Sequence, residues 1–431
     1  MSATKAPGKN WLTIGTLALS GLGIAYFLFQ AMVLSAAWLI SFFDTQNNLV
    51  QSISINLILW SSLLSGVLLV PLFLLSLARL RNRTAPLWLD AGRPINKRII
   101  TGLVIAWPLL ILLGWWIAGQ PMAAAFLLGP LNVLVAGVPV MWVFTAAQKE
   151  LDGGSKLRKW RLFGFSLIIM PLLVIFFEVI AVVVLGGAGL GWFAFQVSRD
   201  PSLERELTVL GNQLMNLGDD VDLILTNLLP LIQQPGVLVW LLSVIAGIMP
   251  LIEEVIKPAA LWSLAGRKIS DQEGFVGGLI CGAGFALMEN VLFFTTVLTA
   301  EDWLFLAVGR AGTGVLHMLA SGLAGWGLAK AWRDGKFLFL GLMTFGAFLL
   351  HAVWNALAVI SGFAPILVYG TEQIPWQGGL FYLPVIILLL FSVLALCLIN
   401  RHFRRRTGQG RHERQAGEDG SSENDSNWVL S

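Results

Sequence analysis

Residues 162–187 read LFGFSLIIMPLLVIFFEVIAVVVLGG and contain one charged residue, Glu178, in an otherwise apolar run. An α-helix crosses the hydrocarbon core of a bilayer with about 20 predominantly apolar residues. This stretch is therefore long enough to span a membrane. A charged side chain inside such a helix is costly and usually faces a functional interior.

Similar apolar runs recur from one end of the chain to the other. The 431 residues are 56% hydrophobic and 12% charged, whereas a soluble protein carries about 25% charged residues. The runs are continuous and do not alternate with polar residues, which excludes the strand pattern of an outer-membrane barrel. The sequence therefore predicts an all-α polytopic membrane protein.

About ten transmembrane helices are predicted, with both termini in the cytoplasm. Basic residues gather in alternate loops, such as 79–98 and 146–161, and the loops between them are neutral or acidic. Cytoplasmic loops carry the excess of Lys and Arg, so this alternation fits an even number of spans. The net charge of +3 is small and does not indicate nucleic acid binding. The predicted spans are 11–40, 55–78, 99–118, 122–145, 162–187, 237–265, 273–298, 305–329, 337–360 and 379–400.

The spans divide the chain into five regions. The acidic segment between the two halves has helix-like spacing, and it fits a lid over the outer face or a solvated linker helix. We expect a five-span membrane region at 1–190, this extracytoplasmic segment at 191–236, a four-span core at 237–360, an external loop with the tenth span at 361–400, and a disordered cytoplasmic tail at 401–431.

The four-span core concentrates ionisable residues inside apolar helices. Counted at about 1.5 Å per residue from the inner end of each span, the side chains lie at similar depth. They can meet only if the helices pack them inward, so we expect a polar site within the bundle. The residues are Glu253, Glu289, His317 and His351.

The sixth span contains LIEEVIKPAALW, residues 251–262. Glu253 and Glu254 precede Lys257 by four and three residues, the spacing of ion pairs in a helix. Pro258 cannot donate to the carbonyl of Glu254, which frees or kinks the helix there. A desolvated carboxylate pair suits a general base or acid. The simpler interpretation is a salt bridge that fixes helix packing.

The seventh span combines glycines with a carboxylate. Gly274, Gly278 and Gly282 fall on one face, which allows a neighbouring helix to approach closely. Their packing would bring Glu289 near partners. Glu289 could serve the site or pair with Arg310 as a structural bridge.

The ninth span contains FLLHAVWNAL, in which His351 and Asn355 share one helix face. Such a pair can place a base or ligand beside an amide that stabilises an oxyanion. The alternative is a hydrogen bond between helices. His317, on the eighth span, is by itself more typical of packing than of catalysis.

Together these motifs resemble the PrsW-type intramembrane proteases. EEVIK, GFALMEN, His317 and HAVWN follow one another on successive spans, over about residues 237–360. The PrsW type belongs to a wider group with the CAAX-processing glutamic endopeptidases and bacteriocin-immunity proteins. The CAAX-processing branch has FxxxH where this chain has Phe285 followed by Glu289, which favours the PrsW branch.

The resemblance implies an intramembrane endopeptidase of the bacterial cytoplasmic membrane. It would hydrolyse a peptide bond of a membrane protein substrate, with an anti-sigma factor as one candidate, inside the lipid bilayer. No oligomeric state is predicted. The implied catalytic residues are Glu253, Glu254, Glu289, His317, His351 and Asn355.

The resemblance also implies roles for these residues. Glu253 and Glu254 would contribute the carboxylate that activates water, His351 would assist as base or ligand, and Asn355 would donate to the oxyanion. Members of the group are often described as metalloproteases, and Glu253, His317 and His351 could hold zinc. The sequence has no HExxH motif, so we favour glutamic catalysis without a metal cofactor.

Two other functions remain open. A proton- or ion-coupled transporter would use the carboxylates and histidines as a relay, and would give a role to Glu178 and the first five spans. No internal repeat relates the two halves, which weakens a transporter built on repeats. The second alternative is a non-catalytic relative that binds membrane partners or protects against a bacteriocin.

Overall fold

The computed structural model describes residues 11–43, 49–84, 97–216, 234–296, 299–369 and 376–425, and it contains no strand within these ranges. Ten helices of the described chain are long and apolar enough to cross a membrane. The predicted all-α polytopic membrane protein is confirmed. The candidate spans are Trp11–Ser41 (α1), Leu49–Leu80 (α2), Thr101–Ala118 (in α4, Lys97–Ala118), Pro121–Ala147 (α5), Lys156–Arg199 (α6), Pro235–Leu264, Asp271–Phe294 (α11), Trp303–Asp334 (in α12, Ala300–Asp334), Phe337–Gly362 (in α13, Phe337–Tyr369) and Gly378–Arg406.

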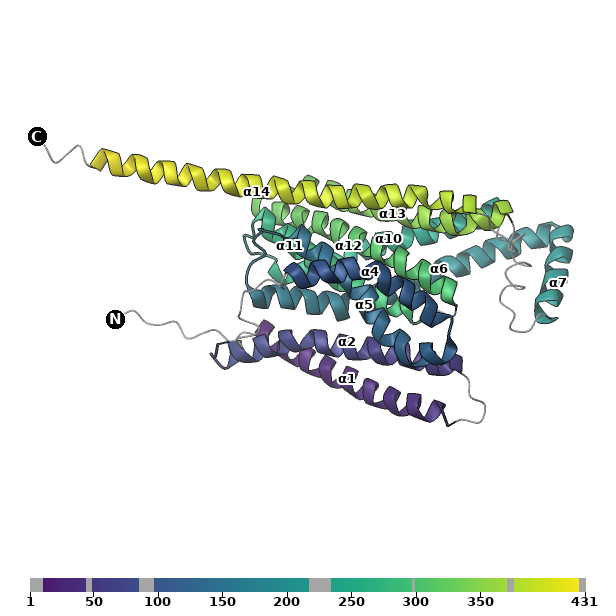
Figure 1. Ribbon diagram of the computed structural model, residues 1–431. Coiled ribbons are helices and arrows are strands. Elements are labelled where there is room, and N and C mark those ends of the chain that lie inside the picture. The colour runs from purple at the N-terminus through teal and green to yellow at the C-terminus, as the bar shows by residue number, and fades with distance from the viewer. Residues whose placement is uncertain are drawn as a thin grey trace, which may run out of the picture.

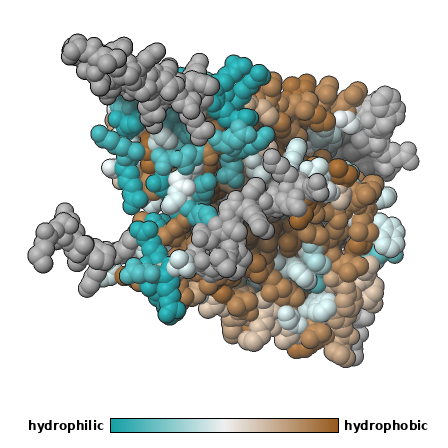
Figure 2. Space-filling view, turned by 60° about the vertical axis from the view of Figure 1, so that its left-hand side comes forward, coloured by the Kyte–Doolittle hydropathy of each residue, from teal (hydrophilic) through white to brown (hydrophobic). Residues whose placement is uncertain are grey.

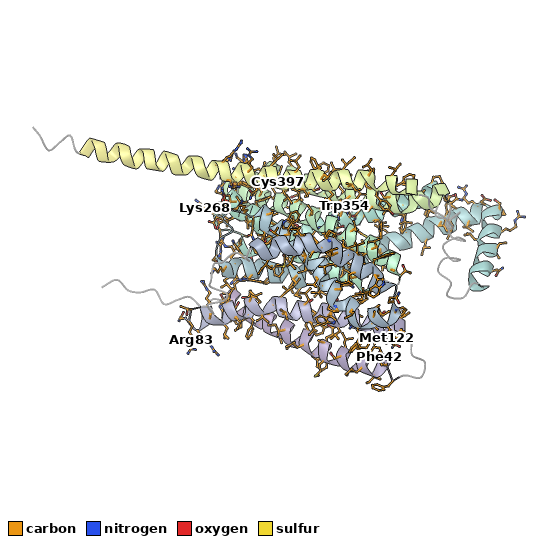
Figure 3. All side chains as sticks on the ribbon, in the orientation of Figure 1. Phe42, Arg83, Met122, Lys268, Trp354 and Cys397 are labelled. Atoms are coloured by element: carbon orange, nitrogen blue, oxygen red, sulfur yellow. The ribbon has the colours of Figure 1, made fainter. Side chains whose placement is uncertain are left out.

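The helices run side by side, and polar residues gather at one end of the bundle (Figures 1 and 2). Arg83 and Lys268 lie at this end, whereas Phe42 and Met122 lie at the opposite end (Figure 3). Ion pairs between elements fix the polar end, and by the positive-inside rule we expect it to face the cytoplasm. These pairs include Arg158–Glu273, Arg333–Asp271 at 2.7 Å and Arg404–Glu150 at 2.5 Å.

Helix α11 lies at the centre of the bundle, and most of its residues are buried. It begins with a capping box, in which Ser270 accepts from the Glu273 amide and the Glu273 side chain accepts from the Ser270 amide. The helix packs against α12, α6, α5 and the sixth span. Side chains carried by α11 are therefore held by neighbours on several sides.

The α11–α12 contact is made by backbone atoms, as the glycine spacing predicted. A Cβ atom at Gly278 would collide with the carbonyl oxygen of Ser321, and one at Gly282 would collide with the carbonyl of His317. The close approach depends on the absence of side chains at these positions. It places His317 directly beside α11.

Substitution of Gly278 by Ala is expected to force α11 and α12 apart. Overpacking of this kind costs about 1–3 kcal/mol, so we expect the free energy of unfolding in detergent to fall by that amount. Gly341→Ala in α13 is the matched control, because nothing lies within 4 Å of a Cβ at Gly341. Equal stability of the two variants would contradict the backbone contact.

The sixth span is a composite of four short helical segments. It consists of α9 (Pro235–Leu242), the π-helix η1 (Ser243–Ile248), α10 (Met249–Ile256) and the 3₁₀-helix η2 (Lys257–Leu264). The change of helix type at Lys257–Pro258 agrees with the predicted break at this proline. The π-helix was not predicted.

Two segments outside the spans extend away from the bundle. The predicted acidic segment begins in the last turns of α6 and continues in helix α7 (Pro201–Asn216), which projects from the far end of α6 (Figure 1). Residues 217–233 lie outside the described ranges. After the short η3 (Trp376–Tyr382), α14 (Leu383–Asp425) continues as a helix through most of the tail that we expected to be disordered. A helix that is already nucleated adds further residues at low cost, which accounts for the difference.

Candidate active site

The elements of the C-terminal half bring the predicted polar residues together inside the bundle. Glu254 and His317 are fully buried, His351 is 2% exposed and Glu253 is 6% exposed. Glu289 joins them from α11 with a side chain that is 20% exposed. Four helices, α10, α11, α12 and α13, thus supply one connected polar cluster.

A side chain of α13 holds the π-helical part of the sixth span in place. Asn355 donates from Nδ2 to the carbonyl oxygen of Ile245, inside the π-helix, at 3.0 Å. A π-turn leaves backbone groups shifted from their usual partners and is frequent at functional sites. In this structure one N–H of Asn355 is therefore used to hold the π-turn, and its amide nitrogen keeps a second N–H.

Lys257 lies at the centre of the cluster and is fully buried. Its Nζ is 2.5 Å from Glu254 Oε1, 3.1 Å from Glu253 Oε2 and 2.8 Å from His317 Nδ1. The ammonium group also lies 4.9 Å from the ring centre of Phe285. Two carboxylates offset the loss of hydration of this buried charge.

His351 is oriented by Glu254. Its Nδ1 lies 2.8 Å from Glu254 Oε1, and its Nε2 lies 4.0 Å from Glu253 Oε1. A carboxylate can only accept, so Nδ1 carries a proton, and in the neutral ring Nε2 is then the acceptor that faces Glu253. A water molecule bound between these two acceptors would donate a hydrogen bond to each of them.

Glu289 pairs with Arg310 and with the site. Its Oε2 forms an ion pair with Arg310 Nη2 at 2.6 Å and accepts a hydrogen bond from His317 Nε2 at 2.6 Å. Arg310 also donates from Nε to Asn290 Oδ1 at 2.8 Å. Glu289 thus pairs with Arg310, as one of the two expectations had it, and contacts run without a break from Glu289 through His317 and Lys257 to Glu254 and His351.

Comparison with known proteins identifies the segment that carries this cluster. Residues 216–393 match the family model for PrsW family intramembrane metalloprotease. This segment is of the PrsW type. The match takes in α9 to α13 and every residue of the cluster, and it covers less than half of the 431 residues. No curated protein and no solved structure matches the chain.

Three residues of the PrsW-type cluster make contacts that were not predicted: Lys257, Arg310 and Asn290. The spacing predicted ion pairs of Lys257 with Glu253 and Glu254, and in the structure Lys257 also contacts His317 from α12. Arg310 and Asn290 form a support for Glu289. The spacing of Glu253, Glu254 and Lys257 was a signal for the local pairs, but nothing in the sequence indicated the contact of Lys257 with His317.

A metal ion could be held by Glu253, His317 and His351, whose ligand atoms all lie within 4.8 Å of one another. One carboxylate and two histidines form a set that catalytic zinc uses, and Glu254 supports His351 as an outer carboxylate would. The contacts of His317 do not fit this reading. Its Nε2 faces Glu289 and its Nδ1 faces the ammonium of Lys257, so a metal on His317 would have to displace one of these partners.

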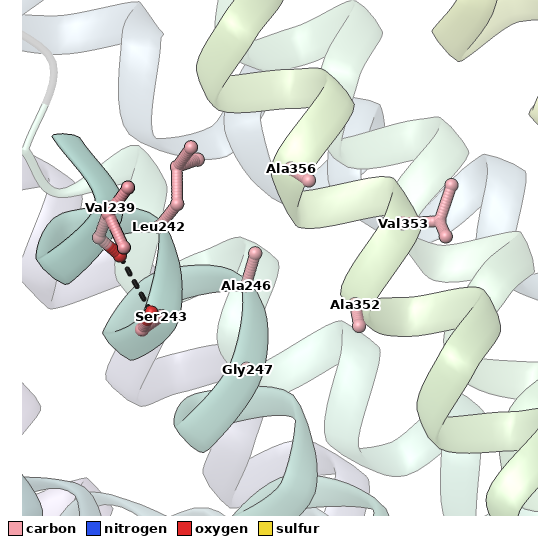
Figure 4. Close-up of a pocket in the computed structure, with 8 residues that line it drawn as sticks. All are labelled: Val239, Leu242, Ser243, Ala246, Gly247, Ala352, Val353 and Ala356. Atoms are coloured by element: carbon pink, nitrogen blue, oxygen red, sulfur yellow. Dashed lines mark hydrogen bonds between the residues drawn. The ribbon is translucent and has the colours of Figure 1, made fainter. Parts of the chain in front are cut away.

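A groove of about 460 Å³ lies between α9 and η1 on one side and α13 on the other (Figure 4). Ala246 and Gly247 line one wall, and Ala352 and Ala356 line the other. Small residues of this kind let another chain approach the backbone closely. Ala352 directly follows His351, so the groove and the PrsW-type site share one helix.

Proposed function

We propose that this chain is an intramembrane endopeptidase that hydrolyses a peptide bond of a membrane protein substrate, with Glu253 as the general base. Membership of residues 216–393 in a protease family model supports peptidase activity. The observation that carries the proposal is the pair of acceptors, Glu253 Oε1 and His351 Nε2, that face each other at 4.0 Å inside a buried polar cluster.

In the proposed reaction, a water molecule donates hydrogen bonds to Glu253 and His351, which leaves an oxygen lone pair free to attack the scissile carbonyl carbon. Glu253 accepts a proton from the water as the C–O bond forms. The negative charge that develops on the carbonyl oxygen is stabilised by the Lys257 ammonium and by the second N–H of Asn355. The C–N bond then breaks, and the nitrogen takes up a proton as it leaves as an amine.

The other residues hold this arrangement. Glu254 keeps the His351 ring in the tautomer whose Nε2 can accept from water, and it fixes Lys257. Glu289 accepts from His317 Nε2, which leaves Nδ1 of this ring to accept from Lys257. Arg310 forms an ion pair with Glu289. Residues that fix rotamers in this way keep the reacting groups in a productive geometry without reorganisation during the reaction.

We favour chemistry without a metal, because the Lys257 ammonium already supplies a cation between Glu253, Glu254 and His317. If zinc were bound, Glu253, His317 and His351 would hold it, and it would polarise the carbonyl or activate water. No step of the proposed reaction depends on it.

A chelator is therefore expected to leave cleavage unchanged. The protein in liposomes would be dialysed against 1,10-phenanthroline, its metal content measured by mass spectrometry, and its cleavage rate compared with that of an undialysed sample. Chelator preloaded with zinc is the control for direct effects on the bilayer. Loss of activity on dialysis and its return with added zinc would establish zinc dependence and overturn the metal-free mechanism.

The activity itself is tested with the purified chain in liposomes and a library of single-span membrane peptides, including the spanning segments of anti-sigma factors. We expect cleavage products by mass spectrometry from the parent, and none from His351→Ala. A folded parent that cuts nothing would contradict the proposal. Proton or solute flux in the same liposomes, lost in the glutamate variants, would then establish a transporter.

A further inference from the structure

Glu178 lies outside the PrsW-type segment, on the face of α6 that packs against it. Val174, one turn before Glu178, is buried in the core cluster that includes Phe285 of α11. Met170, one turn earlier, belongs to the same cluster. Positions three and four residues apart share one helix face, so Glu178 continues this buried stripe.

Two contacts bracket the depth of Glu178 in the bundle. Towards the polar end, Gly284 of α11 lies against the backbone of Phe163 and Leu167. Towards the opposite end, Gly189 of α6 lies against Trp240 of α9. Glu178 lies between these contacts, in the same middle part of the bundle as the carboxylates of α10.

Glu178 is close enough to the candidate active site to interact with its charged residues. It interacts electrostatically with Glu253, Glu289 and Lys257, from α10, α11 and η2. The only charged residue of α2, which also packs on α6, is Arg79 in its last turn. The side chain of Glu178 is half-buried, and it has no hydrogen bond or ion pair with any residue in the described ranges. Within the described ranges Glu178 is thus a carboxyl group without a structural partner, on the face of α6 that packs against α11 and α10.

We propose that Glu178 supplies the proton that the leaving amine requires, and that α6 is in this way part of the peptidase. The inference rests on the proposed function. Glu253 holds the proton taken from water, while Glu178 in its acid form gives a proton to the nitrogen as the C–N bond breaks. Glu178 is left as a carboxylate, and transfer of the proton from Glu253 to Glu178 restores both groups. The net reaction is amide plus water to carboxylic acid plus amine.

An ester bond separates this role from a structural one. An alcohol leaves more readily than an amine and depends less on a proton donor, so a membrane peptide with an ester in place of the scissile amide is the probe. We expect Glu178→Gln to lower kcat for the amide about 100-fold, within the range of general acid catalysis. KM should stay unchanged, and ester cleavage should change by less than about threefold on the same reasoning.

Glu178→Asp, which keeps the carboxyl group, is the matched variant and should retain most amide cleavage. Val182→Gln, one turn along α6, controls for an amide placed in this helix, and thermal unfolding in detergent controls for folding. Equal losses on the amide and the ester, or no loss on either, would overturn the role of Glu178. If Glu178→Gln does not fold, Glu178→Asp becomes the test. Equal losses of amide and ester cleavage in that variant would overturn the proposal. A parent that cuts neither substrate would remove the proposed function itself.

Discussion

Glu253→Gln is expected to abolish detectable cleavage of both amide and ester substrates. The amide side chain has nearly the same shape as the carboxylate but cannot accept a proton from water. Removal of a general base lowers rates by roughly 10²–10⁴-fold. The measurement is single-turnover cleavage of a spanning peptide in liposomes, with the variant at a concentration well above that of the peptide.

Glu254→Gln is the informative comparison for this prediction. Glu254 holds both Lys257 and His351, so its loss should reduce thermal stability as well as cleavage. Glu253→Gln should reduce cleavage with a much smaller change in stability, because Glu253 contacts Lys257 at a longer distance. A Glu253→Gln variant that cuts at the parent rate would assign the base to another residue.

Lys257→Met is expected to have the largest effect on stability. The substitution leaves Glu253 and Glu254 buried side by side without their cation. Breaking a buried ion pair by removal of one partner costs about 3–5 kcal/mol. We expect a loss of this size in the free energy of unfolding, measured in detergent micelles by steric trapping or by denaturant titration.

The double variant Lys257→Met with Glu254→Gln tests the cause of this loss. It removes one positive and one negative charge together, so it should be more stable than Lys257→Met alone. Lys268→Met is the matched control, because Lys268 is exposed at the polar end and its loss should change stability by less than about 0.5 kcal/mol. A single Lys257→Met variant as stable as this control would mean that Lys257 does not hold the cluster.

The spans were predictable because each one depends on composition over a short stretch. Residues 162–187 were expected as the fifth span, and α6 contains them with further turns at both ends. The similar depth of Glu253, Glu289, His317 and His351 was also predictable, because depth follows from the rise of a helix. Their meeting in one cluster needed only that the helices pack these faces inward.

The π-helix and the place of Lys257 were not predictable in this way. The hydrogen bond from Asn355 to Ile245 joins residues 110 positions apart, and nothing in SVIAGI indicates that a carbonyl will be taken by another helix. The contact of Lys257 with His317 likewise depends on how closely α12 approaches α11. Such details follow from tertiary packing, which overrides local propensity.

The contact of Gly278 and Gly282 with α12 has a consequence for the direction from which a substrate arrives. The backbones of α11 and α12 touch at these glycines, so a substrate could enter there only if the two helices separated. Both helices carry residues of the site. By contrast, η1 and α13 leave an open groove between them. We therefore expect a scissile segment to enter from the bilayer along this groove and to reach Glu253 past Ala352. The contact between α11 and α12 would stay closed while the segment is bound.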